Sequence, residues 1–474
     1  MAGKKNRYIA TLLGLMMMIT GCSNQSTDEE NPNVTVATTE SSSEEVSMQS
    51  ANKLNTDIIG GECNDSASDN VTNGLNSETS SISNQLNKEM EEEREYVPDS
   101  DSGDTGYNPK HYDLDLNETF RNNMLGKSID LFKYGYSMDS NVVMSPYSVI
   151  NQFGIVLLGI SDTGTYEGKT AMSNWFGEGG DNSPNYVLSE IKGLNIKFLS
   201  QYEFLYNGVF VTGCTIKNVS GFSKYNTDYV SYNDGENPYD EVNRIIQNDT
   251  GHIAFNENLA IENTTLLSIG YFEDSWIDEA DWYITDHEFV NQDGSSASPN
   301  MALFNENLDY IETDSAYGII KPFKHEDDYS MIFILPKKEN LDSYINSLDK
   351  EEFDSLMESR SKMDVSLMVP SFVANSEMKL NGYMEKEDLG GVLSKEASYY
   401  TFTSEDMEIS HILHKTYFSL NGRGARSYDD ITETYSEKDV QINERSVLCD
   451  KPFIYIIIDN DTNIPVIMGT VSNM

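Results

Sequence analysis

The chain has 474 residues, 38% of them hydrophobic, which is enough for one large domain with a tail. Asp and Glu outnumber Lys and Arg 78 to 32, so the formal net charge is -46. A negative field of that size repels nucleic acid and anionic lipid, so we expect neither as a partner and interpret the acidity as a source of solubility.

The first 22 residues predict an export signal. A basic start, Met1 to Arg7, precedes an apolar run that is too short to span a membrane. The ending Ile19-Thr20-Gly21-Cys22 resembles a bacterial lipoprotein box, in which the cysteine is lipidated and becomes the new N-terminus. We therefore expect an extracellular, cell-surface lipoprotein that contacts the membrane only through a lipid on Cys22.

Residues 23–112 have a different composition, rich in Ser, Asn, Thr, Asp and Glu and poor in aromatic residues. Such a segment buries too little apolar surface to offset its ordering entropy, which predicts a disordered acidic tether. The cysteines beyond the signal, Cys63, Cys214 and Cys449, are scattered and odd in number. We interpret them as free thiols in preference to a disulfide framework.

The globular region is predicted to span 113–474 and to begin with an amphipathic helix. Apolar residues recur there at helical spacing, namely Phe120, Met124, Leu125, Ile129, Phe132 and Tyr136. In the next segment, 141–148, a proline at 146 stands between two serines, which is typical of a helix start. The apolar run 149–160 then predicts a buried helix.

Strands dominate the rest of the chain. They are predicted at 204–211, 265–272, 329–335, 365–369, 415–420, 453–458 and 466–469. A helix is predicted at 341–359, and the last two strands form a hairpin. Because strands and helices follow no regular βαβ alternation, we expect a mixed α+β fold.

A long polar connection stands out between the strands at 415–420 and 453–458. It contains about thirty residues, 421–451, without helical or strand periodicity. Connections of this length inside a compact domain are uncommon and are usually functional or disordered.

Catalytic and metal-binding patterns are missing from the sequence. It contains no HExxH and no GxSxG, and the segment 164–170 is one residue too short for a phosphate loop. His411 and His414 are the one histidine pair near metal-ligand spacing, and a structural role is favoured for both. We expect no enzymatic activity, no metal and no cofactor.

Four separated segments resemble the serpin family. They are Asn141-Val142-x-x-Ser145-Pro146-x-Ser148, residues 242–253, residues 267–276, and residues 450–456 with 466–473. His414-Lys415 is also similar to the strand from which the reactive loop of the family emerges. The segment 242–253 departs from the family pattern, because it is one residue short and lacks an aromatic residue.

The resemblance implies three β-sheets, eight or nine helices and an exposed reactive loop from Gly422 to about Arg445. A target protease would cleave the loop, which would then insert into the central sheet as a new strand. We expect a monomeric inhibitor of a serine protease, with a cysteine protease as the alternative target class. The alternative function is a non-inhibitory surface binding module or a protease substrate.

The resemblance also implies a sheet-opening cluster of Ser145, Ser148, Ser268 and His414. The residues alone favour an ordinary helix cap for Ser145 and Ser148. Ser268 stands where the family has asparagine, and we expect its shorter side chain to lose a hydrogen bond worth about 1 kcal/mol.

The hinge of the loop departs from the family. Gly424 fits the pivot, and Ala425, Ser427 and Ile431 suit the inward face of an inserting strand. Asp429 and Glu433 would place carboxylates on that face, where an unpaired charge is costly. Gly422 replaces a glutamate that closes the top of the sheet in the family, so we expect slow insertion.

Spacing from the hinge places the scissile bond between Lys438 and Asp439. The segment to Phe453 is longer than usual, which leaves Arg445 as an alternative position. Either basic residue would suit a trypsin-like protease with an acidic specificity pocket.

Overall fold

The computed structural model describes most of the globular region. The described residues are 116–161, 167–177, 183–202, 205–212, 216, 227–232, 239–250, 264–324, 328–338, 340–426 and 442–474. They form eight α-helices and three β-sheets, so the predicted α+β class is confirmed. The predicted signal, the tether, Cys22, Cys63 and Cys214 lie outside the described residues.

Four of the described helices begin at a residue whose side chain caps the first turn, whereas two have no side-chain cap. The helices are α3 (Glu118–Gly135), α4 (Pro146–Gly159), α5 (Gly168–Phe176), α6 (Pro184–Tyr202), α8 (Tyr239–Thr250), α9 (Leu341–Ser347), α10 (Lys350–Glu358) and α11 (Asn381–Lys386). The single helix predicted at 341–359 is wrong. Asp349 accepts a hydrogen bond from the Glu352 amide and starts a separate helix there.

The nine-stranded sheet contains the C-terminal hairpin. Its order is β1 (Val142–Met144), β18 (Pro465–Val471), β17 (Phe453–Asp459), β11 (Tyr329–Pro336), β10 (Ala316–Pro322), β9 (Met301–Glu312), β12 (Ser361–Pro370) and β16 (Ser446–Leu448), with β6 (Trp282–Ile284) also on β9. Strands β17 and β18 pair antiparallel, as the sequence predicts, and both are buried throughout.

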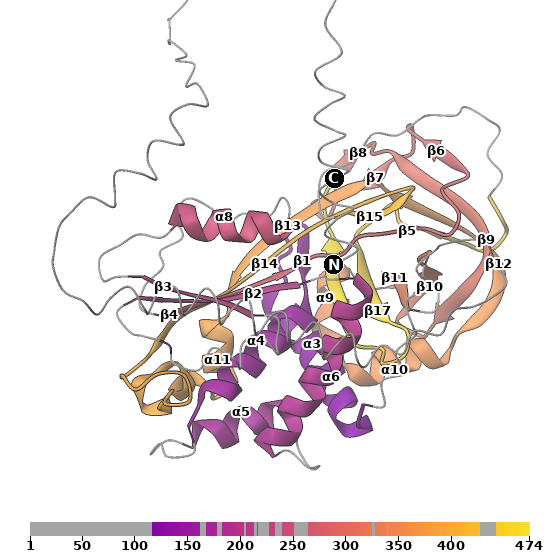
Figure 1. The fold of residues 1–474 in the computed structure, drawn as a ribbon. Helices are drawn as coiled ribbons and strands as arrows, with labels where there is room; N and C mark the ends of the chain where they lie inside the picture. Colours follow the sequence, from indigo (N-terminus) through magenta and orange to yellow (C-terminus); the bar gives the residue numbers. More distant parts are fainter. Residues whose placement is uncertain are drawn as a thin grey trace, which may run out of the picture. The chain divides into compact units, whose positions relative to one another are not determined.

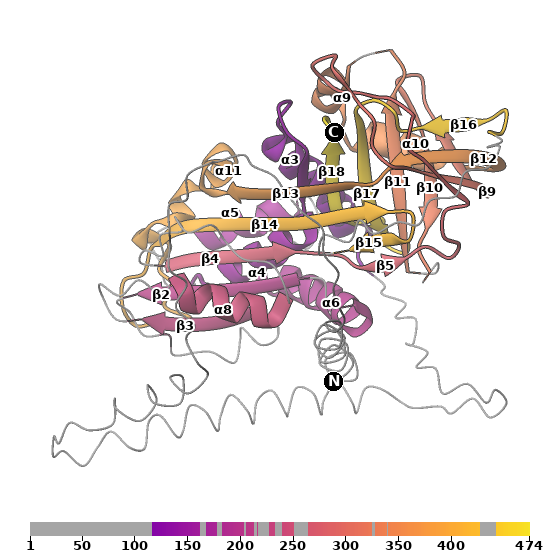
Figure 2. The same cartoon turned by 90° about the horizontal axis from the view of Figure 1, so that it is seen from above.

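The seven-stranded sheet has the long strand β14 at its centre (Figure 2). Its order is β3 (Thr227–Tyr232), β2 (Leu205–Thr212), β4 (Thr264–Gly270), β14 (Ile409–Asn421), β15 (Gly424–Arg426) and β5 (Asp274–Ser275), with β13 (Phe372–Lys379) also on β14. A small hairpin, β7 (Phe289–Val290) with β8 (Ser296–Ala297), is the third sheet.

Both faces of the seven-stranded sheet are covered (Figure 1). The almost fully buried helix α4 packs against one face. On the other face, Val242 and Ile246 of α8 pack with Leu267, Ile269 and Leu413. Because Val242 and Ile246 are one turn apart, α8 presents an apolar stripe to β4 and β14.

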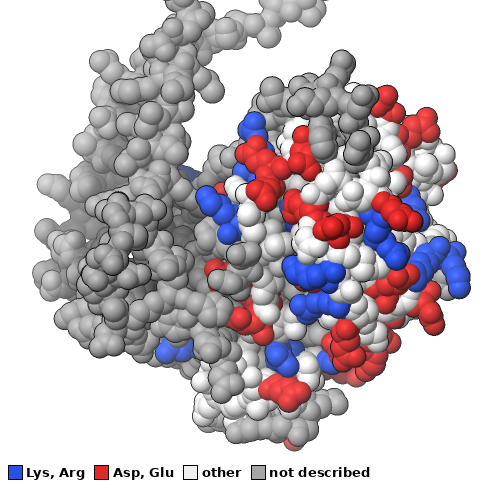
Figure 3. Space-filling model, turned by 90° about the vertical axis from the view of Figure 1, so that its right-hand side faces the viewer, with Lys and Arg blue, Asp and Glu red and all other residues white. Residues whose placement is uncertain are grey.

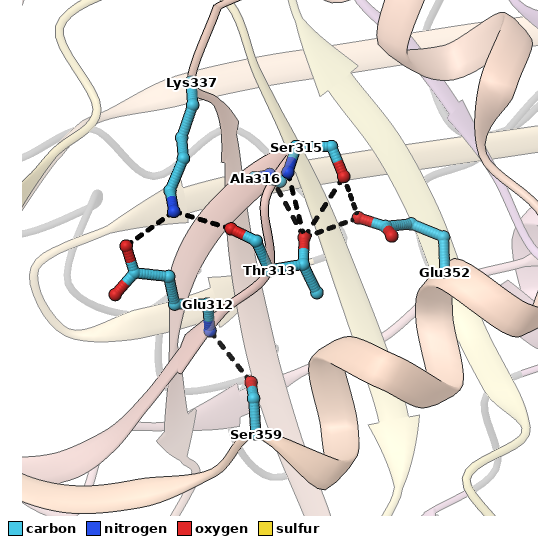
Figure 4. Close-up of polar contacts among 7 residues, drawn as sticks. All are labelled: Glu312, Thr313, Ser315, Ala316, Lys337, Glu352 and Ser359. Atoms are coloured by element: carbon cyan, nitrogen blue, oxygen red, sulfur yellow. Dashed lines mark hydrogen bonds and ion pairs between the residues drawn. The ribbon is translucent and has the colours of Figure 1, made fainter.

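A polar cluster fastens α10 to the turn between β9 and β10 (Figure 4). Glu352 Oε1 accepts hydrogen bonds from Thr313 Oγ1 at 2.7 Å and Ser315 Oγ at 2.5 Å. Lys337 Nζ lies 2.6 Å from Glu312 Oε1 and donates to the Thr313 carbonyl. These contacts close a turn and cap a strand, so we assign the cluster a structural role.

Acidic and basic side chains are interspersed on the face shown in Figure 3. Exposed ion pairs such as Lys362–Asp309, at 3.7 Å, contribute little to stability individually. Within the described ranges, no helix has the length and apolarity needed to cross a membrane. The same ranges contain no group of three or more His, Cys, Asp or Glu side chains arranged to hold a metal ion.

Two glycines test the packing of this fold. A Cβ on Gly469 would lie 2.3 Å from Tyr455 Oη and 2.5 Å from the Val142 carbonyl, whereas a Cβ on Gly126 has nothing within 4 Å. We expect Gly469→Ala to reduce the free energy of unfolding by about 1–3 kcal/mol through overpacking. Gly126→Ala, inside α3, should raise it by about 0.5–1 kcal/mol. Denaturant unfolding measures both, and equal effects would contradict the packing argument.

Candidate functional site

The candidate site is a seam between two parallel strands that are distant in sequence. Strands β4 and β14 are neighbours in the seven-stranded sheet, with His414 opposite Ser268 and Thr416 opposite Gly270. In Figure 2 they run side by side toward the end of the sheet that holds β15 and β5. One edge of each strand is hydrogen-bonded to the other strand. A strand inserted between them would therefore be hydrogen-bonded on both sides.

The short strand β15 lies at the end of this seam. It pairs antiparallel with β14, with Ala425 opposite Leu420, and antiparallel with β5, with Gly424 opposite Ser275. The prediction that the exposed loop begins at Gly422 is therefore wrong. A tight turn at Gly422 and Arg423 folds the chain back into the sheet, and Ala425 is completely buried.

At the C-terminal end of the predicted loop, Arg445 belongs to the folded part of the chain. The Arg445 carbonyl accepts a hydrogen bond from the Ser366 amide, and its guanidinium lies over the Tyr310 ring at 5.0 Å. Strand β16 follows at once and pairs with β12. Arg445 is thus held against the sheet, which weakens the alternative scissile position after this residue.

Side chains alternate across the sheet along β15. Ala425 points into the core, whereas Arg426 points to the other side and donates to the Asp274 carbonyl at 3.0 Å. The same guanidinium donates to the Ala425 carbonyl at 2.7 Å. The predicted hinge residues Ser427 and Asp429 lie outside the described residues, as do Lys438 and Asp439.

Glycine is required at position 424, and space is tight at position 422. Gly424 has φ +133°, and a Cβ there would lie 2.2 Å from the Asp274 carbonyl oxygen. At Gly422 a Cβ would lie 2.3 Å from Tyr283 Oη. Tyr283 therefore occupies the space that a longer side chain at position 422 would need.

An aromatic and charged group anchors the same end of β14. Trp276 Nε1 donates to the Asn421 carbonyl at 3.2 Å, and the indole stacks on Phe323. Lys321 Nζ lies 5.2 Å from the centroid of the indole and 2.5 Å from Glu306 Oε1. Burial lowers the pKa of Lys321, and Glu306 opposes this shift. The sequence analysis did not identify the Lys321–Glu306 pair. A lysine that directly follows two isoleucines in a strand could have indicated a buried, paired charge.

The predicted sheet-opening cluster is assembled beneath the seam. His414 is fully buried, and its Nε2 accepts a hydrogen bond from the Ser145 amide at 3.0 Å. Because an amide can only donate, the neutral ring carries its proton on Nδ1, which lies 2.9 Å from Ser268 Oγ. Burial lowers the pKa of His414 to about 3, and a hydrogen bond with Ser268 opposes the shift.

Two details of this cluster differ from the sequence interpretation. The expectation that Ser268 would lose its hydrogen bond to His414 is wrong, since the two side chains come within bonding distance. Thr416, whose hydroxyl lies 2.9 Å from His414 Nε2, was missed. Its position two residues after His414, on the same face of a strand, is the signal that could have identified it.

Ser145 combines the two roles that the sequence left open, the helix cap and the contact with His414. Ser145 Oγ accepts a hydrogen bond from the Ser148 amide at 3.2 Å, so Ser145 is the N-cap of α4. The Ser145 amide also donates a hydrogen bond to His414. A Cβ on Gly270 would lie 1.9 Å from Ser145 Cβ, so the absence of a side chain on β4 allows this close approach.

These features define a mixed α+β protein in which a long connection leaves the sheet beside a seam of parallel strands. The family Serpin (serine protease inhibitor) matches residues 124–474, and the chain belongs to the serpin family. An uncharacterized serpin-like protein of Methanosarcina acetivorans is 23% identical over 375 residues, covering 73% of this chain and 84% of the relative.

Solved structures support the fold. The thermophilic serpin tengpin in its native state is similar with a TM-score of 0.63 and 20% identity, covering 76% of this chain and 95% of tengpin. Thyroxine-binding globulin in complex with thyroxine gives a TM-score of 0.65 and 15% identity, covering 74% and 98% of the two chains. At these identities the likeness establishes the fold alone.

The lowered pKa of His414 predicts a pH-dependent stability. An unfolded histidine binds a proton below about pH 6.5, whereas the buried ring binds one near pH 3. The contribution of the neutral, buried His414 to the free energy of unfolding is therefore fully present above pH 6.5. It is lost as the pH falls toward 3, at roughly 1 kcal/mol per pH unit. Denaturant unfolding at pH 5 to 8 should show a flatter profile for His414→Gln than for the wild type. Parallel profiles would contradict the assignment.

The conformation of Gly424 predicts a hinge that is sensitive to a methyl group. Gly424→Ala should release β15, because strain at this φ costs about 1–3 kcal/mol. Amide hydrogen exchange in a peptide covering 419–426 should accelerate about 5- to 100-fold. Gly390→Ala, whose Cβ comes no closer than 3.5 Å to another atom, is the control. Unchanged exchange in Gly424→Ala would show that the hinge tolerates a side chain.

Proposed function

We propose that the protein is a cell-surface serpin that inhibits a serine protease through cleavage of its loop and insertion of the freed strand. A cysteine protease is the alternative target class. The observation that carries the proposal is the closed β4–β14 seam with β15 already paired at its end. Strand β15 thus already lies between β14 and β5, at the end of the seam that the freed strand would enter.

Cleavage supplies the freedom that insertion needs. In the intact chain the segment after Arg426 is held at its other end by β16, which pairs with β12. A cut between the two anchors lets the upstream part extend along the seam. Each backbone hydrogen bond formed there contributes about 0.5–1.5 kcal/mol, and a complete strand forms them on both edges.

Lys438–Asp439 is the proposed scissile bond. The hydrogen bond and ring contact that hold Arg445 favour the upstream position. A lysine before the cut fits proteases whose specificity pocket contains a carboxylate, which motivates a trypsin-like target.

The proposed location is the outer cell surface. The lipoprotein-like ending at Cys22 and the acidic segment 23–112 support a lipid anchor with a long spacer. The proposed inhibitor needs no cofactor and acts as a monomer. Cell fractionation with and without Cys22 decides whether the anchor exists.

A non-inhibitory binding module is the second candidate. Asp429 and Glu433 favour it, because carboxylates on the inward face would slow insertion until the protease escapes. Relatives include a corticosteroid-binding globulin of Bos taurus, 21% identical over 238 residues. Loop cleavage that leaves Tm unchanged would favour this candidate, and a pronounced rise in Tm would exclude it.

The inhibitory function predicts a covalent complex. Incubation with trypsin-like proteases should give a complex that survives SDS, and Lys438→Glu should abolish it because the acidic pocket rejects glutamate. Lys395→Glu changes an exposed lysine on the segment before β14 and is the matched control. Absence of any stable complex across a broad panel of serine and cysteine proteases would refute inhibition.

A further inference from the structure

Helix α4 presents a row of polar side chains whose hydrogen-bonding capacity is only partly used. Ser145, Ser148 and Gln152 lie at spacings of three and four residues and therefore share one face. Among the described residues, Ser148 Oγ and both amide atoms of Gln152 are buried without a hydrogen-bond partner. Groups of this kind are rare in folded proteins and call for an explanation.

The row follows the seam. Ser145 lies under the sheet at His414 and Gly270. The far end of α4 at Gly159 packs on Tyr399 and Phe402, which precede β14 in the chain. Helix α4 thus runs antiparallel to β14. Seven helical residues span about 10 Å, and four strand residues span about 13 Å. Gln152 is therefore expected beneath Ile412 and Leu266.

The pairing of β15 with β14 sets the register that an inserting strand would continue. Arg426 stands opposite Ser419, so each further loop residue meets the preceding residue of β14. Asp429 would then stand opposite Thr416, and Glu433 opposite Ile412. In such a strand both would share the inward face of Ala425, because side chains alternate along a strand.

We propose that the row Ser145, Ser148 and Gln152, with Thr416, is a built receptor for the two inward carboxylates of the inserting strand. Asp429 would meet the hydroxyl of Thr416 and the serine cap. Glu433 would meet Ser148 Oγ and the Gln152 amide. The inference rests on the proposed function, since it concerns the inserted state.

Residues on the outward face of the inserting strand would not meet the row. Asp430 would stand opposite Lys415, whose ammonium lies 3.6 Å from Glu377 of β13 on the face away from His414. Lys415 and Glu377 therefore do not face the row. Asp430 therefore provides a carboxylate in the same segment that the receptor would not hold.

A double-mutant cycle on the full chain tests the receptor. The quantity measured is the gain in Tm when limited trypsin cuts the loop, with the cut located by mass spectrometry. Gln152→Leu or Glu433→Leu alone leaves one polar group unpartnered after insertion and should reduce the gain by roughly 3 °C. The double variant should recover most of the gain, because both partners are then apolar.

The controls separate the receptor from the proposed function. In the uncut chain, Gln152→Leu should keep or raise Tm, since it removes a buried amide without partners. Asp430→Leu combined with Gln152→Leu should give additive effects. Recovery in the Glu433 double variant alone supports the receptor. The receptor is overturned if cleavage raises the Tm of the wild type but Gln152→Leu is additive with both Glu433→Leu and Asp430→Leu. If cleavage does not raise the Tm of the wild type, insertion itself is refuted.

Discussion

A strand can join a sheet only where two neighbours can each exchange one hydrogen-bonded edge for another. The parallel pairing of β4 with β14 provides this place. The two strands come from distant parts of the chain, so no short turn ties them together. Helix α8 covers the seam on one face and α4 on the other. The hinge, the imidazole cluster and the aromatic anchor all lie along this pair or at its end.

The closed seam is held mainly by neutral hydrogen bonds. His414 accepts from the α4 cap and approaches Ser268 of β4, so one ring joins both strands and the helix beneath them. A neutral imidazole can exchange these partners without leaving a buried charge, which an ion pair at the same place could not do. At the hinge end, the Trp276–Asn421 hydrogen bond and the buried Lys321–Glu306 pair fix the strand end more firmly.

Much of the fold was predictable because its signals are local. The helices α3 and α4, the hairpin β17–β18 and the Ser145 cap follow from periodicity, apolar runs and one proline. Strand β15 was not predictable, because a three-residue strand between glycines and arginines has no pattern of its own. Its pairing depends on β5, which is distant in sequence. Tyr283, which fills the space at Gly422, is likewise brought there only by the tertiary fold.

In the proposed inserted state, the carboxylates of Asp429 and Glu433 would give the unpartnered polar atoms of α4 a role. In a closed sheet, a buried Gln152 amide without partners is a defect that apolar packing would remove at no loss. In an inserted sheet, a carboxylate on the inward face is an equal defect if nothing receives it. The two defects lie on the same register line, which begins at the Ala425–Leu420 pair. Insertion would therefore satisfy both together and favour the expanded sheet over the closed one.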